Sequence, residues 1–236
     1  MGAGCVIEAY AIIKRHSILG NGVVVHPFAI IGGDPQFLKF DPATISGAQV
    51  GAGTIIREHS TINRSIHGGK YTHVGARCFL MANAHVGHDS VVGDDVVLGN
   101  NVLLAGHVDV GANTFLGGAV GVHQFCRIGE GVIAGGMATL TQDVAPFLMV
   151  AERNRLSGFN SVGLKRRGFS RETIKELKDC YARVFSDGNP RTHAAALLAG
   201  GVTSPEARRF LEFFGGGKRG FVRPRRAGEA GVHDGE

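Results

Sequence analysis

The fold of this 236-residue chain is decided by residues 86–110, which read VGHDSVVGDDVVLGNNVLLAGHVDV. In this stretch an aliphatic residue returns at every sixth position, and the same spacing extends outward in both directions. Three runs carry it: Val6, Ile12, Ile18, Val24 and Ile30; Val50, Ile56 and Ile62; and Val74, Leu80, Val86, Val92, Leu98, Leu104, Val110, Leu116, Val122, Ile128, Ala134 and Leu140. The twelve unbroken hexads of the third run mark the sequence as a repeat array.

A period of six residues predicts a three-sided coil. It matches neither the 3.6-residue period of a helix nor the alternation of an ordinary strand. Each hexad would give one short strand with its aliphatic residue pointing to the axis. Glycine, Asn and Asp at 93–94, 99–100 and 111–113 would form the corners. Three hexads make a coil of eighteen residues, and stacked coils bury each other's apolar faces. The predicted fold class is therefore an all-β solenoid.

The periodicity also divides the chain. We expect a β-helix over residues 1–150, interrupted by loops at 32–44 and 64–73, where the register breaks. These loops are either binding elements or tolerated insertions. Beyond Pro146 we expect a small α-helical domain at 151–216, with helices beginning at Ser170, after Pro190 and at Ser204. The basic, Gly-rich residues 217–236 are expected to be disordered.

Composition and charge exclude several classes of protein. With 44% hydrophobic residues and 37 glycines, the chain is too apolar for global disorder and too rich in glycine for a helical bundle. Four widely spaced cysteines predict reduced thiols, and no leader or membrane span is apparent, so we expect a cytoplasmic protein. The net charge is −2 over 1–151 and +7 over 152–236. The basic C-terminal part suits an acidic partner or a phosphate-bearing ligand, or is simply a solvated surface.

Four histidines fall among the repeats, at His85, His88, His107 and His123. Eighteen residues per coil place Gly106 over His88, with His107 beside it, and Asp89 can orient the His88 imidazole. We interpret His88 as a general base and the Gly106 amide as an oxyanion donor. The alternative is a stacked histidine ladder on a solvated face. No metal is expected, because no close pair of ligand residues accompanies these histidines.

Four stretches resemble the signatures of the UDP-N-acetylglucosamine O-acyltransferases of lipid A biosynthesis: 83–89 (NAHVGHD), 104–108 (LAGHV), 122–126 (VHQFC) and 163–170 (GLKRRGFS). The resemblance runs from about residue 5 to about residue 215. It implies a left-handed coil and a homotrimer with clefts between adjacent solenoids. It also implies transfer of a hydroxyacyl group from acyl carrier protein to the sugar 3-hydroxyl of a UDP-sugar, the first step of lipid A synthesis. No cofactor, nucleic acid or transmembrane segment is expected.

The same resemblance assigns roles to individual residues. His88, Asp89 and Gly106 would be catalytic. The substrate-binding positions would be Lys39, His85, His107, His123, Gln124, Asn160, Arg166 and Arg167. Gly136, together with Ile133, would set the acyl-chain pocket, and glycine there leaves room for a longer chain.

The chain also departs from the family pattern. Phe37 stands where an aspartate contacts the sugar hydroxyls, Asn63 stands in place of a cleft histidine, and the solenoid is shorter by roughly two coils. Phenylalanine cannot accept a hydrogen bond, so a paralog with an altered nucleotide-sugar acceptor is one alternative. A non-catalytic solenoid that binds acyl carrier protein or nucleotide sugar is another, and an acetyltransferase that uses acetyl-coenzyme A is a third.

Overall fold

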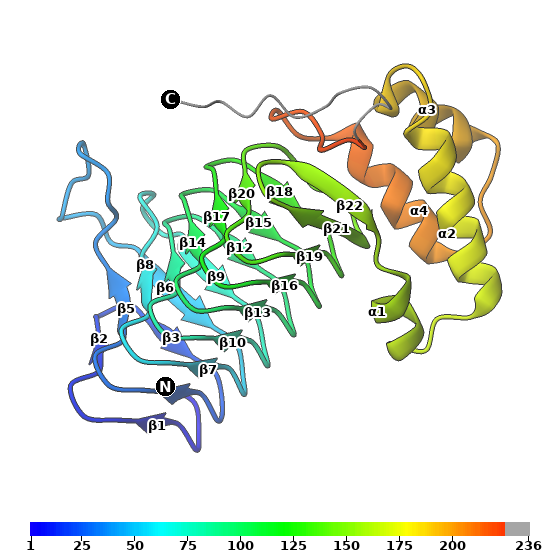
Figure 1. The fold of residues 1–236 in the computed structure, drawn as a ribbon. Helices are drawn as coiled ribbons and strands as arrows, with labels where there is room; N and C mark the ends of the chain where they lie inside the picture. Colours follow the sequence, from blue (N-terminus) through cyan, green and yellow to red (C-terminus); the bar gives the residue numbers. More distant parts are fainter. Residues whose placement is uncertain (225–236) are drawn as a thin grey trace, which may run out of the picture.

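The chain winds through three sheets in a computed structural model that describes residues 1–224 (Figure 1). All strand pairs in them are parallel except that of the last two strands of sheet A. Sheet A holds β1 (Val6–Ile7), β4 (Val24–Val25), β7 (Ile55–Ile56), β10 (Phe79–Leu80), β13 (Val97–Leu98), β16 (Phe115–Leu116), β19 (Ile133–Ala134), β21 (Leu148–Ala151) and β22 (Arg155–Phe159). Sheet B holds β2 (Ile12–Ile13), β5 (Ile30–Gly33), β8 (Thr61–Asn63), β11 (His85–Val86), β14 (Leu103–Leu104), β17 (Gly121–Val122) and β20 (Thr139–Leu140). Sheet C holds β3 (Ile18–Leu19), β6 (Gly47–Val50), β9 (Tyr71–Val74), β12 (Val91–Val92), β15 (Asp109–Val110) and β18 (Arg127–Ile128).

The strand order shows that three strands make one turn of the coil. Through the first twenty strands, each strand pairs with the third one before and after it in the chain. In the uninterrupted coils the register advances by eighteen residues, so that Val86 pairs with Leu104 and Leu104 with Val122. The inward residues of the second and third runs are 0–3% exposed, which confirms the expected apolar axis for these two runs.

The phase predicted for the first run is wrong by one residue. Val6, Ile12 and Ile18 are 43–50% exposed, and the inward positions belong instead to Leu19, Val25 and Ile31. The register explains this, because Leu19 pairs with Val50, Val25 with Ile56 and Ile31 with Ile62. Each strand of this run carries two adjacent aliphatic residues, and the sequence pattern picked the outward one.

The corner glycines serve close stacking of the coils. A Cβ on Gly93 would lie 2.7 Å from the Ala112 amide nitrogen of the next coil, and one on Gly99 would lie 2.7 Å from that of Gly118. The left-handed backbone falls later in each corner, on Asp95, Asn101 and Asn113, with φ near 58°. Asn and Asp tolerate that conformation better than other residues with a side chain.

The two expected loops are present with shifted bounds. The first runs over residues 34–46, between β5 and β6, and projects from the solenoid in Figure 1. The second runs over residues 64–70, because Tyr71–Val74 forms β9 and pairs with β6. The expected range 32–44 is therefore two residues early at both ends, and the expected range 64–73 is correct at its start and three residues too long.

Beyond the coil the chain makes an antiparallel hairpin of β21 and β22 and then a helical part, so residues 151–159 are not helical as expected. The helices are α1 (Ser161–Arg166), α2 (Arg171–Val184), α3 (Pro190–Ala199) and α4 (Pro205–Glu212), followed by the short 3-10 helix η1 (Phe213–Gly215). Ser170 and Ser204 cap α2 and α4, and α3 begins at Pro190, so all three expected helices are confirmed; α1 was not expected. No helix in the described residues is long and apolar enough to cross a bilayer.

The expectation of disorder from residue 217 onward is wrong for its first part. Phe221 and Val222 are 7% and 1% exposed, and Phe221 packs on Phe214 with ring centroids 4.9 Å apart. The backbone of this segment also pairs with Asp143, which donates to the Gly220 carbonyl and accepts from the Val222 amide. The rest of the expected tail, residues 225–236, lies outside the described residues.

Candidate functional site

The candidate site lies along the edge where the chain passes from sheet B to sheet C, here called the B–C edge. Both loops leave the coil at this edge, since each connects a sheet B strand to a sheet C strand. In the following coils the same edge carries His88–Asp89, Gly106–His107 and His123–Phe125. The repeat thus brings polar and histidine side chains from separate coils to the same edge of the solenoid.

His88 and Asp89 form the central pair. Nδ1 of His88 lies 2.9 Å from Oδ2 of Asp89, and their side chains are 14% and 9% exposed. The corner turns the His88 side chain outward, away from the apolar axis. Both residues can therefore reach a ligand at the edge while being largely shielded from water.

Asp89 is held from the 64–70 loop and from the coil below. The Ser65 hydroxyl donates to Oδ1, the Ile66 amide donates to Oδ2 at 3.1 Å, and the Asp89 amide donates to Thr72 Oγ1 at 2.8 Å. Burial alone would raise the pKa of Asp89, but the hydrogen bonds from Ser65, Ile66 and His88 together lower it. Asp89 is therefore a carboxylate at neutral pH and can only accept, so Nδ1 of His88 carries the proton.

Gly106 packs directly against the His88 ring. A Cβ at this position would lie 2.5 Å from Cε1 and 2.6 Å from Nε2 of His88, so only glycine leaves room for the imidazole here. The Gly106 amide has no hydrogen-bond partner among residues 1–224. The equivalent turn amides of other corners also lack a partner within these residues, so what distinguishes Gly106 is its contact with the His88 ring. This geometry matches the stacking of Gly106 over His88 that the repeat predicted.

Two further histidines surround this pair. The His107 ring stands edge-on to His88, with centroids 5.1 Å apart, and stacks on Phe125 at 4.8 Å. His85 lies on β11, where its Nδ1 is 2.7 Å from Thr61 Oγ1. Burial lowers the pKa of both, and the charge of His88 lowers them further. His85 and His107 are therefore neutral imidazoles at pH 7.

A groove of about 560 Å³ runs along the outer face of sheet B, beside the B–C edge. Its lining is largely apolar, with Leu103 and Gly121 in the middle, and His85 and His123 face into it. His123 and Gln124 are exposed, and the Gln124 carbonyl accepts from His123 Nδ1 and from Arg219 Nε. Within residues 1–224, the Gln124 side chain makes no hydrogen bond.

Three of the predicted substrate-binding residues lie away from His88 within one chain. Asn160 Nδ2 donates to the Gly131 carbonyl and its Oδ1 accepts from Gly163, so this buried amide caps α1. Arg167 pairs with Glu130 at 3.2 Å, and Arg166 ends α1 with an exposed side chain. Residues 130 and 131 lie where sheet C passes to sheet A, a different edge from that of His88.

The two predicted acyl-pocket residues are also apart from the pair. Ile133 lies on β19 of sheet A, and Gly136 lies in the corner that leads to β20 of sheet B. Gly136 is exposed, and a Cβ built on it would meet the Gly118 carbonyl oxygen at 3.3 Å. A single chain therefore does not bring Gly136 and Ile133 to the catalytic candidates.

The 34–46 loop brings Phe37 to the pair. The Phe37 and His88 ring centroids lie 6.2 Å apart, and Phe37 is 44% exposed. Lys39, two residues on, is exposed and has no hydrogen bond or ion pair among the described residues. Nearby, Asn63 Nδ2 donates to the Asp34 carbonyl at 3.0 Å, while its buried Oδ1 has no partner within residues 1–224.

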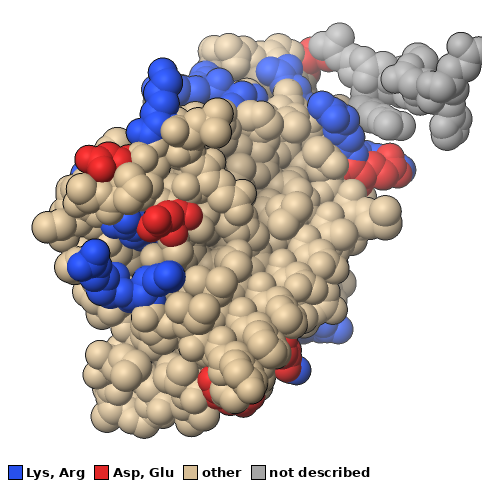
Figure 2. Space-filling model, turned by 90° about the vertical axis from the view of Figure 1, so that its left-hand side faces the viewer, with Lys and Arg blue, Asp and Glu red and all other residues tan. Residues whose placement is uncertain are grey.

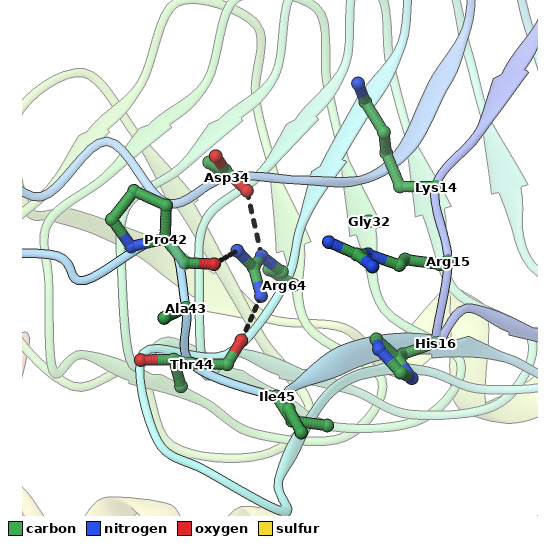
Figure 3. A pocket seen from close by; sticks show the side chains of 10 residues that line it. All are labelled: Lys14, Arg15, His16, Gly32, Asp34, Pro42, Ala43, Thr44, Ile45 and Arg64. Atoms are coloured by element: carbon green, nitrogen blue, oxygen red, sulfur yellow. Dashed lines mark hydrogen bonds and ion pairs between the residues drawn. The ribbon is translucent and has the colours of Figure 1, made fainter.

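Arg64 fastens the base of this loop, as Figure 3 shows. Its guanidinium pairs with Asp34 at 2.9 Å and donates to the carbonyls of Pro42 and Thr44. The neighbouring pocket, of about 630 Å³, is also lined by Lys14, Arg15 and His16. In Figure 2, Lys and Arg side chains gather around an acidic one on the face turned to the viewer, and much of the rest of that face is uncharged.

The sequence reasoning missed a histidine beside the pair. The donor atoms of His67, Asp89 and His107 all lie within 4.8 Å of one another, a cluster able to hold a metal ion. The residues come from three successive turns of the coil, so they form no short ligand motif in the sequence. The one sequence signal was the register break at 64–70, which places Ser65 and His67 in a loop beside a histidine-rich edge.

Comparisons with known proteins agree with the repeat fold. A family model described as bacterial transferase hexapeptide (six repeats) matches residues 71–106, and one described as UDP N-acetylglucosamine O-acyltransferase, domain 2, matches residues 143–222. The chain is 37% identical to an acyl-[acyl-carrier-protein]–UDP-N-acetylglucosamine O-acyltransferase of Agrobacterium fabrum, over 88% of this chain and 78% of that protein. It is 39% identical to the protein of the same name from Paracoccus denitrificans, over 85% and 77%. The solved structure of UDP-N-acetylglucosamine acyltransferase from Campylobacter jejuni is 31% identical and superposes with a TM-score of 0.85 over 95% of each chain. The chain therefore belongs to the family of UDP-N-acetylglucosamine O-acyltransferases.

Proposed function

We propose that this protein transfers a (3-hydroxy)acyl group from acyl carrier protein to the 3-position of a UDP-N-acetylglucosamine-type sugar, the first step of lipid A synthesis. The names of its relatives give the donor and the acceptor class. The observation that carries the proposal is His88, with Nδ1 on the Asp89 carboxylate and its ring, Nε2 included, packed against Gly106.

The chemistry follows from the proton positions. With its proton on Nδ1 and donated to Asp89, His88 presents the free lone pair of Nε2, which takes the proton of the sugar hydroxyl. The hydroxyl oxygen forms a bond to the thioester carbonyl carbon, and the Gly106 amide stabilises the oxyanion that develops. The C–S bond then breaks, and His88 returns its proton to the leaving thiolate. The products are the acyl sugar and the free thiol of the carrier.

The substrate groove next to this pair suits an acylated sugar. Thr61, His85 and His123 supply polar groups at the rim, and Leu103 with Gly121 supplies an apolar floor. Neutral His85 and His107 can each donate or accept one hydrogen bond to a sugar hydroxyl. No cofactor takes part in the proposed reaction, because the thioester is already activated.

The proposed site needs more than one copy of the chain. Asn160, Arg166 and Arg167 lie at a different edge from His88, so in a homotrimer these residues of one copy would face the histidines of its neighbour. A guanidinium fork from Arg166 or Arg167 suits a diphosphate. The likeness to solved members of the family supports a left-handed sense for the coil. A place in the cytoplasm is also part of this proposal.

A second candidate is an altered sugar acceptor, and Phe37 favours it. Its ring lies 6.2 Å from that of His88, at a position where the family pattern has a hydrogen-bonding aspartate. Phenylalanine offers an apolar contact in place of an acceptor, so the sugar or its 3-substituent can differ from that of the relatives, including a 3-amine in place of the hydroxyl.

One assay separates these possibilities. Purified protein is incubated with 3-hydroxyacyl carrier protein and UDP-N-acetylglucosamine, its 3-amino analogue or other UDP-sugars, and products are identified by mass spectrometry. We expect turnover that His88→Ala abolishes. Turnover that survives His88→Ala would remove the mechanism, and no turnover with any sugar would favour a non-catalytic binding protein. Phe37→Asp should raise kcat/KM for UDP-N-acetylglucosamine if Phe37 alters acceptor choice.

A further inference from the structure

His67, Asp89 and His107 form a compact set of donors at the mouth of the candidate site. Their donor atoms lie within 4.8 Å of one another, and the His67 and His107 ring centroids are 6.2 Å apart. His67 is exposed on the 64–70 loop, whereas Asp89 and His107 are partly buried on the solenoid. Two groups are thus fixed on a rigid scaffold, and a third reaches over them from a loop.

We propose that these three residues bind a divalent cation of the zinc class, and that its binding inhibits the enzyme reversibly. Two imidazoles and one carboxylate are a common ligand set for zinc and other late transition metals, with a further position left for water. This donor set selects against magnesium and calcium, which prefer oxygen ligands.

The donor geometry needs only a small closure. Ligand atoms about 2.1 Å from a tetrahedral zinc ion lie roughly 3.4 Å apart, against the 4.8 Å limit of the present cluster. His67 can supply the movement because its side chain is exposed. Its backbone is positioned by Ser65, whose hydroxyl accepts from the His67 amide at 2.9 Å while donating to Asp89. The same hydroxyl therefore aligns two of the three ligands.

The Asp89 carboxylate keeps room for a metal. It accepts hydrogen bonds from Ser65, Ile66 and His88, which leaves about one of its four lone-pair positions for a cation. Two of these bonds go to Oδ2 and one to Oδ1, so Oδ1 is the oxygen with capacity left.

Inhibition follows from the shared carboxylate, and this part rests on the proposed function. The Asp89 carboxylate accepts a hydrogen bond from the proton on His88 Nδ1, and this leaves Nε2 unprotonated and able to act as a base. A dication on Asp89 draws charge away from that hydrogen bond and repels the imidazolium that forms when His88 takes a proton. It also occupies His107, one of the proposed sugar-binding groups. The loaded protein should therefore turn over more slowly.

Metal binding is tested directly, without reference to activity. Zn²⁺ is titrated calorimetrically into the protein with its thiols reduced, and Co²⁺ is titrated while its visible absorption is recorded, since tetrahedral cobalt absorbs far more strongly than the hydrated ion. We compare wild type with His67→Gln and with His16→Gln, which removes an exposed histidine of the same edge outside the cluster. We expect one bound ion per chain, at least about tenfold weaker binding in His67→Gln, and wild-type binding in His16→Gln.

The activity arm separates the two proposals. Zn²⁺ should inhibit acyl transfer by wild type and His16→Gln, a chelator should restore it, and His67→Gln should keep its activity while losing most of the sensitivity. Unchanged binding in His67→Gln overturns the metal site, and His67-dependent binding without inhibition overturns its inhibitory role. Metal binding that depends on His67 in a protein with no transferase activity would leave the site standing and remove the proposed function instead.

Discussion

Gly106→Ala is the substitution that tests the proposed geometry most directly. The new Cβ would lie 2.5 Å from Cε1 and 2.6 Å from Nε2 of His88, whereas non-bonded carbon atoms settle at about 3.5–4.0 Å. The His88 ring must therefore move by about 1 Å. Because Nδ1 and Oδ2 of Asp89 are 2.9 Å apart, such a shift stretches or misaligns their hydrogen bond.

We expect kcat to fall about 100-fold, since a displacement of about 1 Å in a reacting group typically costs that much. In free energy of activation the loss is about 2.7 kcal/mol. The amide of residue 106 remains, so the effect reports the position of His88 and not the loss of the oxyanion donor. The assay is steady-state acyl transfer at saturating substrates, accompanied by circular dichroism and thermal unfolding to show that the coil is intact.

Gly118→Ala is the matched control. Gly118 occupies the same place in a turn at another edge, and the nearest atom to its added Cβ would be the Asn100 carbonyl oxygen, at 3.4 Å. This variant should fold normally and keep its activity within about threefold. Activity of Gly106→Ala within about twofold of wild type would refute the reasoning, because His88 would then not act from the position it occupies beside Gly106.

Three further predictions follow from the contacts of single residues. Asp89→Asn replaces an acceptor that fixes the His88 tautomer, so kcat should fall at least about 100-fold while folding is retained, as measured by turnover beside circular dichroism. Asp143→Ala leaves Arg127 without the fully buried carboxylate that lies 2.7 Å from its Nη2, and should lower the free energy of unfolding by about 3 kcal/mol in a urea titration; a change below about 1 kcal/mol would contradict a stabilising role. Burial, with the charge of His88, lowers the pKa of His85 in the folded chain below its ordinary value of 6.5. At a pH between the folded and the unfolded pKa of His85, the unfolded chain therefore binds more protons than the folded chain. The free energy of unfolding should fall as the solution is acidified through this interval. His85→Gln should flatten this slope between pH 7 and 5, and an unchanged slope would rule out His85 as its source.

The sequence predicted the repetitive part of the fold well and its ends poorly. Aliphatic residues at every sixth position bury themselves against the coils above and below, so the pattern and the structure are linked locally. The hairpin of β21 and β22 and the short helix α1 carry no such pattern and went unpredicted. Phe221 and Val222 look like isolated apolar residues in a basic tail, and only the folded chain shows that both are buried, with Phe221 packed on Phe214.

The candidate site was predicted as far as the repeat reaches. Because every coil has eighteen residues, residues about eighteen positions apart lie next to each other in space. His88, Gly106 and His107 could therefore be placed together from the sequence. Asn160 shows the opposite case: a residue assigned to nucleotide binding uses both of its amide groups within its own chain, to cap α1 and to bond Gly131.

The sequence by itself determined the three-sided coil, its eighteen-residue register and the edge on which the histidines meet, because burial of a periodic apolar residue leaves one consistent winding. Tertiary structure alone decided which of two adjacent aliphatic residues points inward in the first run, since either one satisfies the period and only pairing with Val50, Ile56 and Ile62 chooses. It also decided the surroundings of Asp89. The path of the 64–70 loop depends on hydrogen bonds that Ser65 and Ile66 make near its start, and such single contacts leave no periodic pattern in the sequence.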